Sequence, residues 1–388
     1  MVNQSPWPWP RAILIKVNEV PLVTIVTPSL NSGRYIRHAI ESILAQDYPR
    51  IEHIVVDGGS SDGTREILAE YPGIKVVDSA PDNGAAHAIN IGFQKATGSI
   101  FTWLNADDAY LPGAISSAVK RFQQEPGPDV VYGKTFWIDT EGVGIGSYPT
   151  QAFQADALSR ECIISQPATF IRSDAFRSIG MLNPDEKYTF DYDLWIRMAK
   201  TYRFEYVAEY WANCRMHPSS ITFSDRRRVL EANMRLLKRH YGYVPLQWIY
   251  GYCCHIRDSR DQFFEPLRHS TIAYATSLSE GLSRNPGHKG RFIKDWISAL
   301  LRRSALKSFW QGLATGRNHS GISGPSAGPR DKTDGPDLKL ERTATNNPAR
   351  NGGSKSAPSD PATFGSAFQA ASTLSIASHV RIDKSKAG

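Results

Sequence analysis

The sequence predicts an α/β protein in which a mostly parallel sheet is covered by helices. From Leu22 to about residue 128, apolar runs typical of strands alternate with runs whose apolar residues recur every three or four positions, as in helices. Such alternation is typical of repeated β-α-β units. The strand-like runs are "LVTIVTP", "IEHIVVD", "IKVVD" and "SIFTWLN", and the helix-like runs between them are "RYIRHAIESILAQ", "DGTREILAEY" and "GAAHAINIGFQKA".

After residue 128 the alternation weakens, and we expect strands at "DVVYGK" and "FWID", a helix over 173–179 and another over 191–201. The last 73 residues, 316–388, are rich in Gly, Ser, Pro, Asn, Lys and Ala, a composition that buries too little apolar surface to offset the entropy of ordering. The predicted organisation is an N-terminal extension over 1–20, a domain over 21–222, a helical basic extension over 223–315 and a disordered tail over 316–388.

Composition excludes several classes of protein. With 41% hydrophobic residues among 388, the chain can build a sizeable core. A net charge of +7 is modest for this length, so no nucleic-acid partner is expected. The four cysteines show no metal-ligand spacing, and the adjacent pair Cys253 and Cys254 favours a reduced, cytoplasmic chain. No apolar run approaches the roughly 18 residues of a membrane span, and the N-terminus lacks the layout of a signal peptide.

The stretch "TWLNADDAYLPG" places Asn105, Asp107 and Asp108 directly after an apolar strand. Carboxylates crowded in this way repel one another unless a positive group lies between them. Divalent cations such as Mg²⁺ and Mn²⁺ prefer carboxylate oxygens and commonly bridge them to a diphosphate. The stretch therefore predicts a divalent metal site. The alternative is that one aspartate caps the next helix and the other is solvated.

Polar residues also follow the other predicted strands, in "PSLNSG", "DGGSSDG" and "DSAPDNG". In open parallel sheets, ligands bind at the carboxyl ends of the strands. Asp57 ends the second strand, and the glycines after it permit a tight turn that a polar ligand can approach. An ordinary turn in which Asp62 caps the next helix explains the same residues. Pro28, Ser29 and Asn31 are likewise open to a reading as turn chemistry alone.

Two later segments carry candidate functional groups. In "KYTFDYDLWIRMAK", Asp191 and Asp193 stand at the start of a predicted helix, where a carboxylate either complements the helix terminus or serves as a general base. In "NCRMHPSS", Arg215 and His217 point to the same side if the segment is extended. A histidine beside an acidic metal site can contact a diphosphate or the metal, although many histidines are structural.

The order and spacing of these pieces resemble glycosyltransferase family 2, inverting enzymes that use nucleotide sugars and have the GT-A fold. The resemblance covers roughly residues 21–222. It rests jointly on "VTIVTPSLNSGRYIRHAIESILAQDYPRIEHIVVDGGSSDGT", "DNGAAHAINIGFQKATGSIFTWLNADD" and "SQPATFIRSDAFRSIGMLNPDEKYTFDYDLWIRMA".

The resemblance implies roles for individual residues. Asp191 corresponds to the catalytic base that deprotonates the acceptor hydroxyl, and Asp107 to the residue that holds a divalent metal, Mg²⁺ or Mn²⁺. The implied donor-binding residues are Pro28, Ser29, Asn31, Asp57, Asn90, Asn105, Asp108 and His217. The sequence departs from the family at Asn105, where an Asp is usual, and at Phe190, where a Glu often precedes the base.

The implied function is transfer of a sugar from a nucleoside-diphosphate sugar to a hydroxyl of a glycan or lipid-linked acceptor, in surface polysaccharide or glycolipid biosynthesis. One alternative is a non-catalytic nucleotide-sugar-binding or scaffold protein, to which Asn105 lends weight. Another is a nucleotidyltransferase, for which "TPSLNSGRY" has few glycines to form a phosphate loop. A P-loop enzyme is excluded by the lack of GxxxxGK[ST].

Residues 288–313, "HKGRFIKDWISALLRRSALKSFWQGL", predict a helix that combines an apolar stripe with many cations. Phe292, Trp296 and Leu300 recur at steps of four along the stripe, and Ile293 and Ile297 widen it. Such a helix favours anionic lipid headgroups, which predicts a peripheral contact with the inner face of the cell membrane. The alternative is a helix packed on the catalytic domain.

Overall fold

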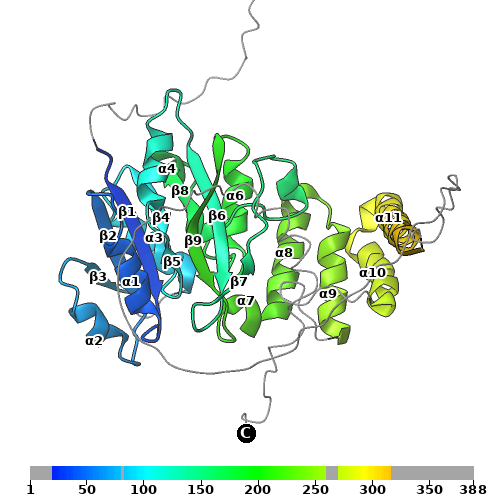
Figure 1. Ribbon diagram of the computed structural model, residues 1–388, viewed down its shortest axis with the longest axis horizontal. Coiled ribbons are helices and arrows are strands. Elements are labelled where there is room, and N and C mark those ends of the chain that lie inside the picture. Colours follow the sequence, from blue (N-terminus) through cyan, green and yellow to red (C-terminus); the bar gives the residue numbers. More distant parts are fainter. Residues whose placement is uncertain (1–19, 80–82, 259–269, 316–388) are drawn as a thin grey trace, which may run out of the picture. The chain divides into compact units, whose positions relative to one another are not determined.

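The computed structural model describes residues 20–79, 83–258 and 270–315 (Figure 1). The predicted tail over 316–388 and the N-terminal extension, except Val20, lie outside the described residues. The chain forms two compact units, whose described parts are residues 20–258 with 270–294 and residues 295–315.

A nine-stranded sheet forms the centre of the first unit, with the strand order β3-β2-β1-β4-β8-β6-β9-β5 and β7 paired to β6. The strands β1 to β4 are parallel to one another, as the β-α-β pattern predicts, whereas β8 is antiparallel to both β4 and β6. The strands are β1 Val23–Ser29, β2 Ile51–Asp57, β3 Lys75–Asp78, β4 Ile100–Trp103, β5 Ala109–Tyr110, β6 Val130–Ile138, β7 Gly144–Ser147, β8 Thr169–Arg172 and β9 Phe204–Arg215.

Helices flank this sheet and continue beyond it (Figure 1). The α-helices are α1 Ile36–Leu44, α2 Thr64–Ala69, α3 Ala85–Gln94, α4 Ala114–Phe122, α5 Ser173–Ser178, α6 Phe190–Met198, α7 Ile221–Ser224, α8 Arg226–Tyr241, α9 Leu246–Asp258, α10 Thr271–Arg284 and α11 Lys289–Thr315. Short 3-10 turns occupy Ala157–Ser159, Gln166–Ala168 and Pro286–His288. None of the helices in the described part of the chain is long and apolar enough to span a membrane.

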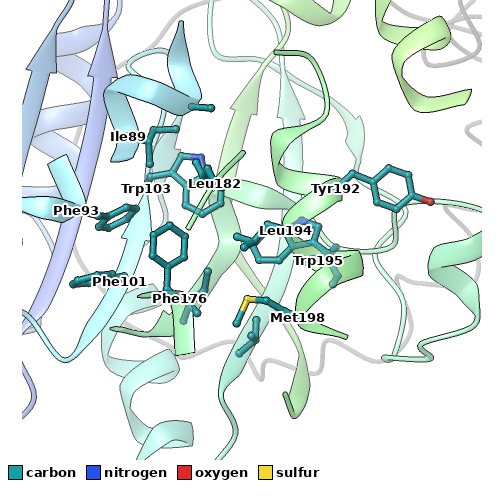
Figure 2. Packing of buried hydrophobic residues seen from close by; sticks show 14 of the residues in the cluster. Ile89, Phe93, Phe101, Trp103, Phe176, Leu182, Tyr192, Leu194, Trp195 and Met198 are labelled. Carbon is teal, nitrogen blue, oxygen red and sulfur yellow. The ribbon is translucent and has the colours of Figure 1, made fainter. Parts of the chain in front are cut away.

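Alternation along the strands divides the core between the two faces of the sheet. Val23 and Ile25 of β1 pack in a cluster with α1 and α4, whereas Val26 belongs to a cluster with α3, α5 and α6. Figure 2 shows the second cluster, in which Trp103 at the end of β4 stacks on Trp195 of α6 with ring centroids 5.8 Å apart. Both indoles are fully buried. This packing holds the first turns of α6 close to the carboxyl end of β4.

The elements predicted up to residue 128 are present, and the α/β class is confirmed. The predicted strands "DVVYGK" and "FWID" are one continuous strand, β6. The two predicted segments are separated only by Thr135, which is fully buried in the strand. Within the strand, Gly133 leaves no room for a side chain, since a Cβ would lie 2.6 Å from the buried indole of Trp211 on β9. The predicted domain boundary at residue 222 falls just before α8, whose Leu236 and Leu237 pack in the same cluster as α6.

The contact between α10 and α11 depends on a glycine. A Cβ at Gly281 would lie 1.9 Å from the ring of Phe292, which is fully buried. We therefore expect Gly281→Ala to lower the free energy of unfolding by about 1–3 kcal/mol, the usual cost of overpacking. Denaturant unfolding measures this. Gly290→Ala is the control, since no atom lies within 4 Å of its Cβ position and an alanine there should be neutral or stabilising. Equal effects of the two substitutions would contradict this packing.

Candidate functional site

The carboxyl ends of β1, β2 and β4 lie side by side because these strands are parallel neighbours. Ser29 is the register partner of Asp57, and Asn105 follows β4 two residues after Trp103. The turns after all three strands therefore meet at one edge of the sheet, where ligands of open parallel sheets bind.

Asp107 and His217 come together at this edge although 110 residues separate them. Asp107 Oδ2 lies 2.9 Å from His217 Nε2, and His217 Nδ1 lies 2.8 Å from Ser219 Oγ. The side chain of His217 is 9% exposed and that of Asp107 is 27% exposed. The imidazole is therefore fixed in orientation, while the carboxylate keeps a face open to a ligand.

Asp108, in contrast, is buried and takes part in the local structure. Its Oδ1 accepts a hydrogen bond from the backbone N–H of Arg215 at 3.0 Å, and its Oδ2 accepts one from Asn105 Nδ2 at 3.0 Å. Burial, together with the charge of Asp107, raises the pKa of Asp108. The amide at position 105 also donates to Gln166 Oε1 at 3.2 Å. An aspartate at position 105 would lack these N–H donors and would add a third acidic side chain.

Arg215 joins the loop that carries Asp107 and Asp108 to the turn after β6 and to the start of α1. Its guanidinium donates to the carbonyl of Asp107 at 3.2 Å and to that of Asp139 at 2.9 Å, and lies 3.1 Å from His38 Nδ1. It also lies over the ring of Tyr35, 4.9 Å from the centroid. Burial and the charge of Arg215 lower the pKa of His38. Tyr35, His38 and Gln166 were not predicted as site residues.

The spacing of Tyr35 and His38 in the sequence could have identified them as site residues. Tyr35 and His38 are three residues apart at the start of α1, directly after the "NSG" turn. Such a spacing places both side chains on one face of the first helical turn. The side chain of Gln166, which donates to the carbonyl of Trp103 at 2.6 Å, carries no such local pattern.

Asp57 is buried beneath its own turn. Its side chain has no exposed surface and accepts hydrogen bonds from the backbone N–H of Ser60 at 3.0 Å, from Ser60 Oγ at 2.5 Å and from Arg65 Nε at 3.0 Å. Burial acts to raise the pKa of Asp57, but these donors outweigh burial and lower it. Arg65 reaches on to Asp78 at the end of β3, at 2.5 Å.

The turns after β1 and β2 are tied together by Asn31, which has a left-handed φ of 50°. Its backbone N–H donates to Ser60 Oγ at 2.8 Å, and its Oδ1 accepts from the N–H of Ser61 at 2.9 Å. Ser29 is 5% exposed, and its Oγ finds no hydrogen-bond partner among the described residues. A buried hydroxyl without a partner is costly, so Ser29 is a group that a polar ligand would satisfy. Pro28 is half-buried in β1.

The side chain of Asn90 forms its hydrogen bonds with Leu182, and not with the residues described above. Its Nδ2 donates to the carbonyl of Leu182 at 2.8 Å, and its Oδ1 accepts from the N–H of Leu182 at 3.2 Å. Both hydrogen bonds join α3 to the segment that leads into α6. The structure thus gives Asn90 a backbone-anchoring contact.

The two aspartates of α6 have different surroundings. Asp191 is half-buried, and burial raises its pKa, with the N–H of Tyr192 donating to Oδ1 at 2.8 Å as a smaller opposing effect. Asp193 is 2% exposed and is held by Arg197 Nε at 2.7 Å and His240 Nε2 at 2.8 Å. Arg197 and His240 occupy Asp193, which leaves Asp191 as the carboxylate suited to accept a proton.

No group of three or more His, Cys, Asp or Glu side chains within residues 20–79, 83–258 and 270–302 is arranged to hold a metal ion. Asp107 and His217 supply one carboxylate and one imidazole. Magnesium is commonly bound by one or two carboxylates together with substrate phosphates and water, so these two side chains fit a metal that a bound diphosphate helps to hold.

The raised pKa of Asp191 implies a cost in stability. A carboxyl group that holds its proton more tightly when folded stabilises the protein below its ordinary pKa of 3.8, and this is lost as pH rises through the raised value. We therefore expect Asp191→Asn to raise the Tm at pH 8 and to leave it unchanged near pH 4. Thermal unfolding at both pH values tests this, with exposed Asp185→Asn as the control. A lower Tm at pH 8 would contradict it.

Comparison with known proteins adds independent information. Residues 24–179 match the family model of glycosyl transferase family 2. An uncharacterized glycosyltransferase of Rickettsia prowazekii is 33% identical over 211 residues, which are 52% of this chain and 66% of the relative. A putative teichuronic acid biosynthesis glycosyltransferase of Bacillus subtilis is 40% identical over 97 residues, or 24% of this chain and 38% of the relative.

The chain spans 66% of the Rickettsia prowazekii relative and 32% of a similar protein of Rickettsia felis. Among solved structures, S. aureus TarS 1-349 in complex with UDP has a TM-score of 0.50 and 17% identity over 75% of this chain and 92% of that one. This likeness supports the predicted GT-A fold. The sequence matches, in turn, identify residues 24–179 as a glycosyltransferase family 2 domain.

Proposed function

We propose that the protein is an inverting glycosyltransferase that moves a sugar from a nucleoside-diphosphate sugar to a hydroxyl of a glycan or lipid-linked acceptor. The observation that carries the proposal is the contact of Asp107 with His217, which places a half-exposed carboxylate and an oriented imidazole at the carboxyl end of β4. With a divalent cation between the carboxylate and the phosphates, these groups would suit a diphosphate that departs with negative charge. TarS has been solved with UDP and with UDP-GlcNAc, so uridine nucleotides are the first donors to test.

Binding of the donor is assigned to the turns after β1 and β2. The unpartnered hydroxyl of Ser29 offers a hydrogen bond to a polar ligand. Asp57 is closed in by Ser60 and Arg65, so a nucleobase that contacts Asp57 must displace the hydroxyl of Ser60. The implied donor-site roles of Pro28 and Asn31 remain proposals, as does that of Asn90.

A divalent metal, when bound, would neutralise charge on the departing diphosphate. Asp107 and His217 are the side chains that would hold it. Asn105 and Asp108 would hold the backbone of the loop that carries Asp107 in place, since the amide of Asn105 and the N–H of Arg215 both donate to Asp108.

Asp191 is proposed as the general base. Its half-buried position raises its pKa, which makes it a better proton acceptor than a solvated aspartate. Deprotonation of the acceptor hydroxyl lets the oxygen attack the anomeric carbon from the face opposite the departing diphosphate, so the product has the inverted configuration. The proton is then held on the carboxyl group of Asp191.

A lipid-linked acceptor is consistent with the exposed face of α11. Ile293, Ile297, Leu300 and Leu301 are 39% to 62% exposed and recur on one side of this helix. Exposed Lys289, Lys294 and Arg302 accompany them. The inclusion of Phe292 in this stripe was wrong, because Phe292 is fully buried against Gly281.

The first test joins donor binding to turnover. We expect one member of a panel of UDP-, GDP- and dTDP-sugars to raise the Tm, because a ligand that binds only the folded state stabilises it. With that donor and a lipid-extracted acceptor pool, Asp191→Asn should lower turnover by roughly 10²–10⁴-fold with donor binding retained. Near-native turnover would contradict the role of Asp191. Donor binding without any transfer by the unaltered chain would favour the non-catalytic alternative that Asn105 raises.

The second test concerns the metal. We expect excess EDTA to abolish transfer and Mn²⁺ or Mg²⁺ to restore it, and Asp107→Asn to lower kcat by about 10²-fold, since a metal supplies several kcal/mol of charge stabilisation. Exposed Asp156→Asn, which contacts Arg160 on its own turn, is the matched control. Activity that survives EDTA would rule out the metal.

The third test concerns the membrane. Co-sedimentation with vesicles that contain anionic lipid should require that lipid, weaken in high salt and fall several-fold in Ile297→Glu and Leu301→Glu. Ile272→Glu on α10, at a position 63% exposed, should bind as the unaltered chain does. Equal recovery in the supernatant with and without anionic vesicles would exclude membrane binding by α11.

A further inference from the structure

The helix α8 (Figure 1) lies beyond the residues that match the family model. Polar and charged side chains join it to α6. Asp193 of α6 is 2% exposed. Its Oδ1 lies 2.8 Å from His240 Nε2 and 3.5 Å from Arg239 Nη2, and its Oδ2 accepts from Arg197 Nε at 2.7 Å. A buried carboxylate is stable only with such partners. Two of these three partners come from α8.

The same network holds the segment that leads into α6. Arg239 Nη1 lies 2.6 Å from Glu186 Oε1, and Glu186 Oε2 accepts from Thr189 Oγ1 at 2.9 Å. Arg197 donates to the carbonyls of Ile179 and Met181 at 2.8 and 2.7 Å. These contacts hold the backbone that leads into α6, the helix whose first turn carries Asp191.

Asp191 lies inside this network without belonging to it. The N–H of Asp193 donates to the carbonyl of Thr189 at 2.8 Å, which closes the first turn of α6 around Asp191. Within the described part of the chain, the side chain of Asp191 accepts a hydrogen bond only from the N–H of Tyr192, next to it in sequence. A shift of Asp193 would therefore move Asp191, although no group of α8 contacts Asp191 in these hydrogen bonds.

We propose that Arg239 and His240 are positioning residues that hold Asp191 in place by clamping Asp193 and Glu186. This inference rests on the proposed role of Asp191 as the base. A displacement of about 1 Å at a reacting group can lower a rate by about 10²-fold. Donor binding depends on the turns after β1, β2 and β4, so loss of the clamp should lower kcat and leave the KM for the donor unchanged.

The experiment compares Arg239→Ala, His240→Ala and His240→Gln, whose amide N–H can replace that of the imidazole. Arg227→Ala is the matched control, because Arg227 is an exposed arginine of α8 that pairs with Glu231 of the same helix. With the donor and lipid extract that give turnover in the panel, the two alanine variants at positions 239 and 240 should lose about 10- to 100-fold in kcat with donor KM within about twofold. His240→Gln should recover most of the loss. Hydrogen exchange over residues 190–194 should rise in the alanine variants alone.

Several results would overturn the proposal: unchanged kcat in both alanine variants, a loss that His240→Gln does not recover, a donor KM that rises as kcat falls, or unchanged exchange over 190–194. Asp191→Asn is assayed beside them to separate the two proposals. Near-native turnover of Asp191→Asn contradicts the base itself. Its inactivity, combined with native kcat in the α8 variants, contradicts only the positioning role.

Discussion

The burial of Asp108 is the constraint on which the acidic edge of the sheet depends. A carboxylate that is 1% exposed needs hydrogen-bond donors, and the backbone N–H of Arg215 and the amide of Asn105 provide them. The hydrogen bond from the N–H of Arg215 brings the end of β9 against the loop after β4. His217 follows Arg215 by two residues and thereby reaches Asp107. The contact between Asp107 and His217 thus follows from the hydrogen bond that the buried carboxyl group of Asp108 accepts from Arg215.

The carboxylates of this protein fall into two groups according to their partners. Asp57 and Asp193 are buried but paired with arginine, so their charge is compensated and their role is to fix turns and helices. Asp191 is half-buried without an arginine or lysine partner in the described ion pairs, and its pKa is raised. An uncompensated, partly buried carboxylate lowers stability and is retained where chemistry needs a proton acceptor. This difference separates Asp191 from Asp193 although the two are neighbours on one helix.

The residues that match the family model end at 179, but the site continues beyond them. Asp191 lies on α6, His217 follows β9, and α8 supplies the charges that anchor α6. Leu236 and Leu237 of α8 share the core cluster with Trp103 and Trp195, so α8 packs with α6 as well as pairing with it. The C-terminal helices up to residue 294 belong to the same compact unit as the sheet.

The sequence by itself determined the alternation of strands and helices up to residue 128, the parallel strands β1 to β4, and the family, because these follow from local periodicity and from motifs of fixed spacing. The resemblance of its motifs to the family also singled out Asp107, His217 and Asp191 as candidates. The sequence did not predict that β6 continues through Thr135, which separates the two predicted strands and is fully buried in the structure. Tertiary structure alone decided which candidates meet and which are already engaged, as Asn90 is with Leu182 and Asp57 with Arg65. The physical reason is that burial and hydrogen bonding are set by residues distant in the chain, which no local pattern encodes.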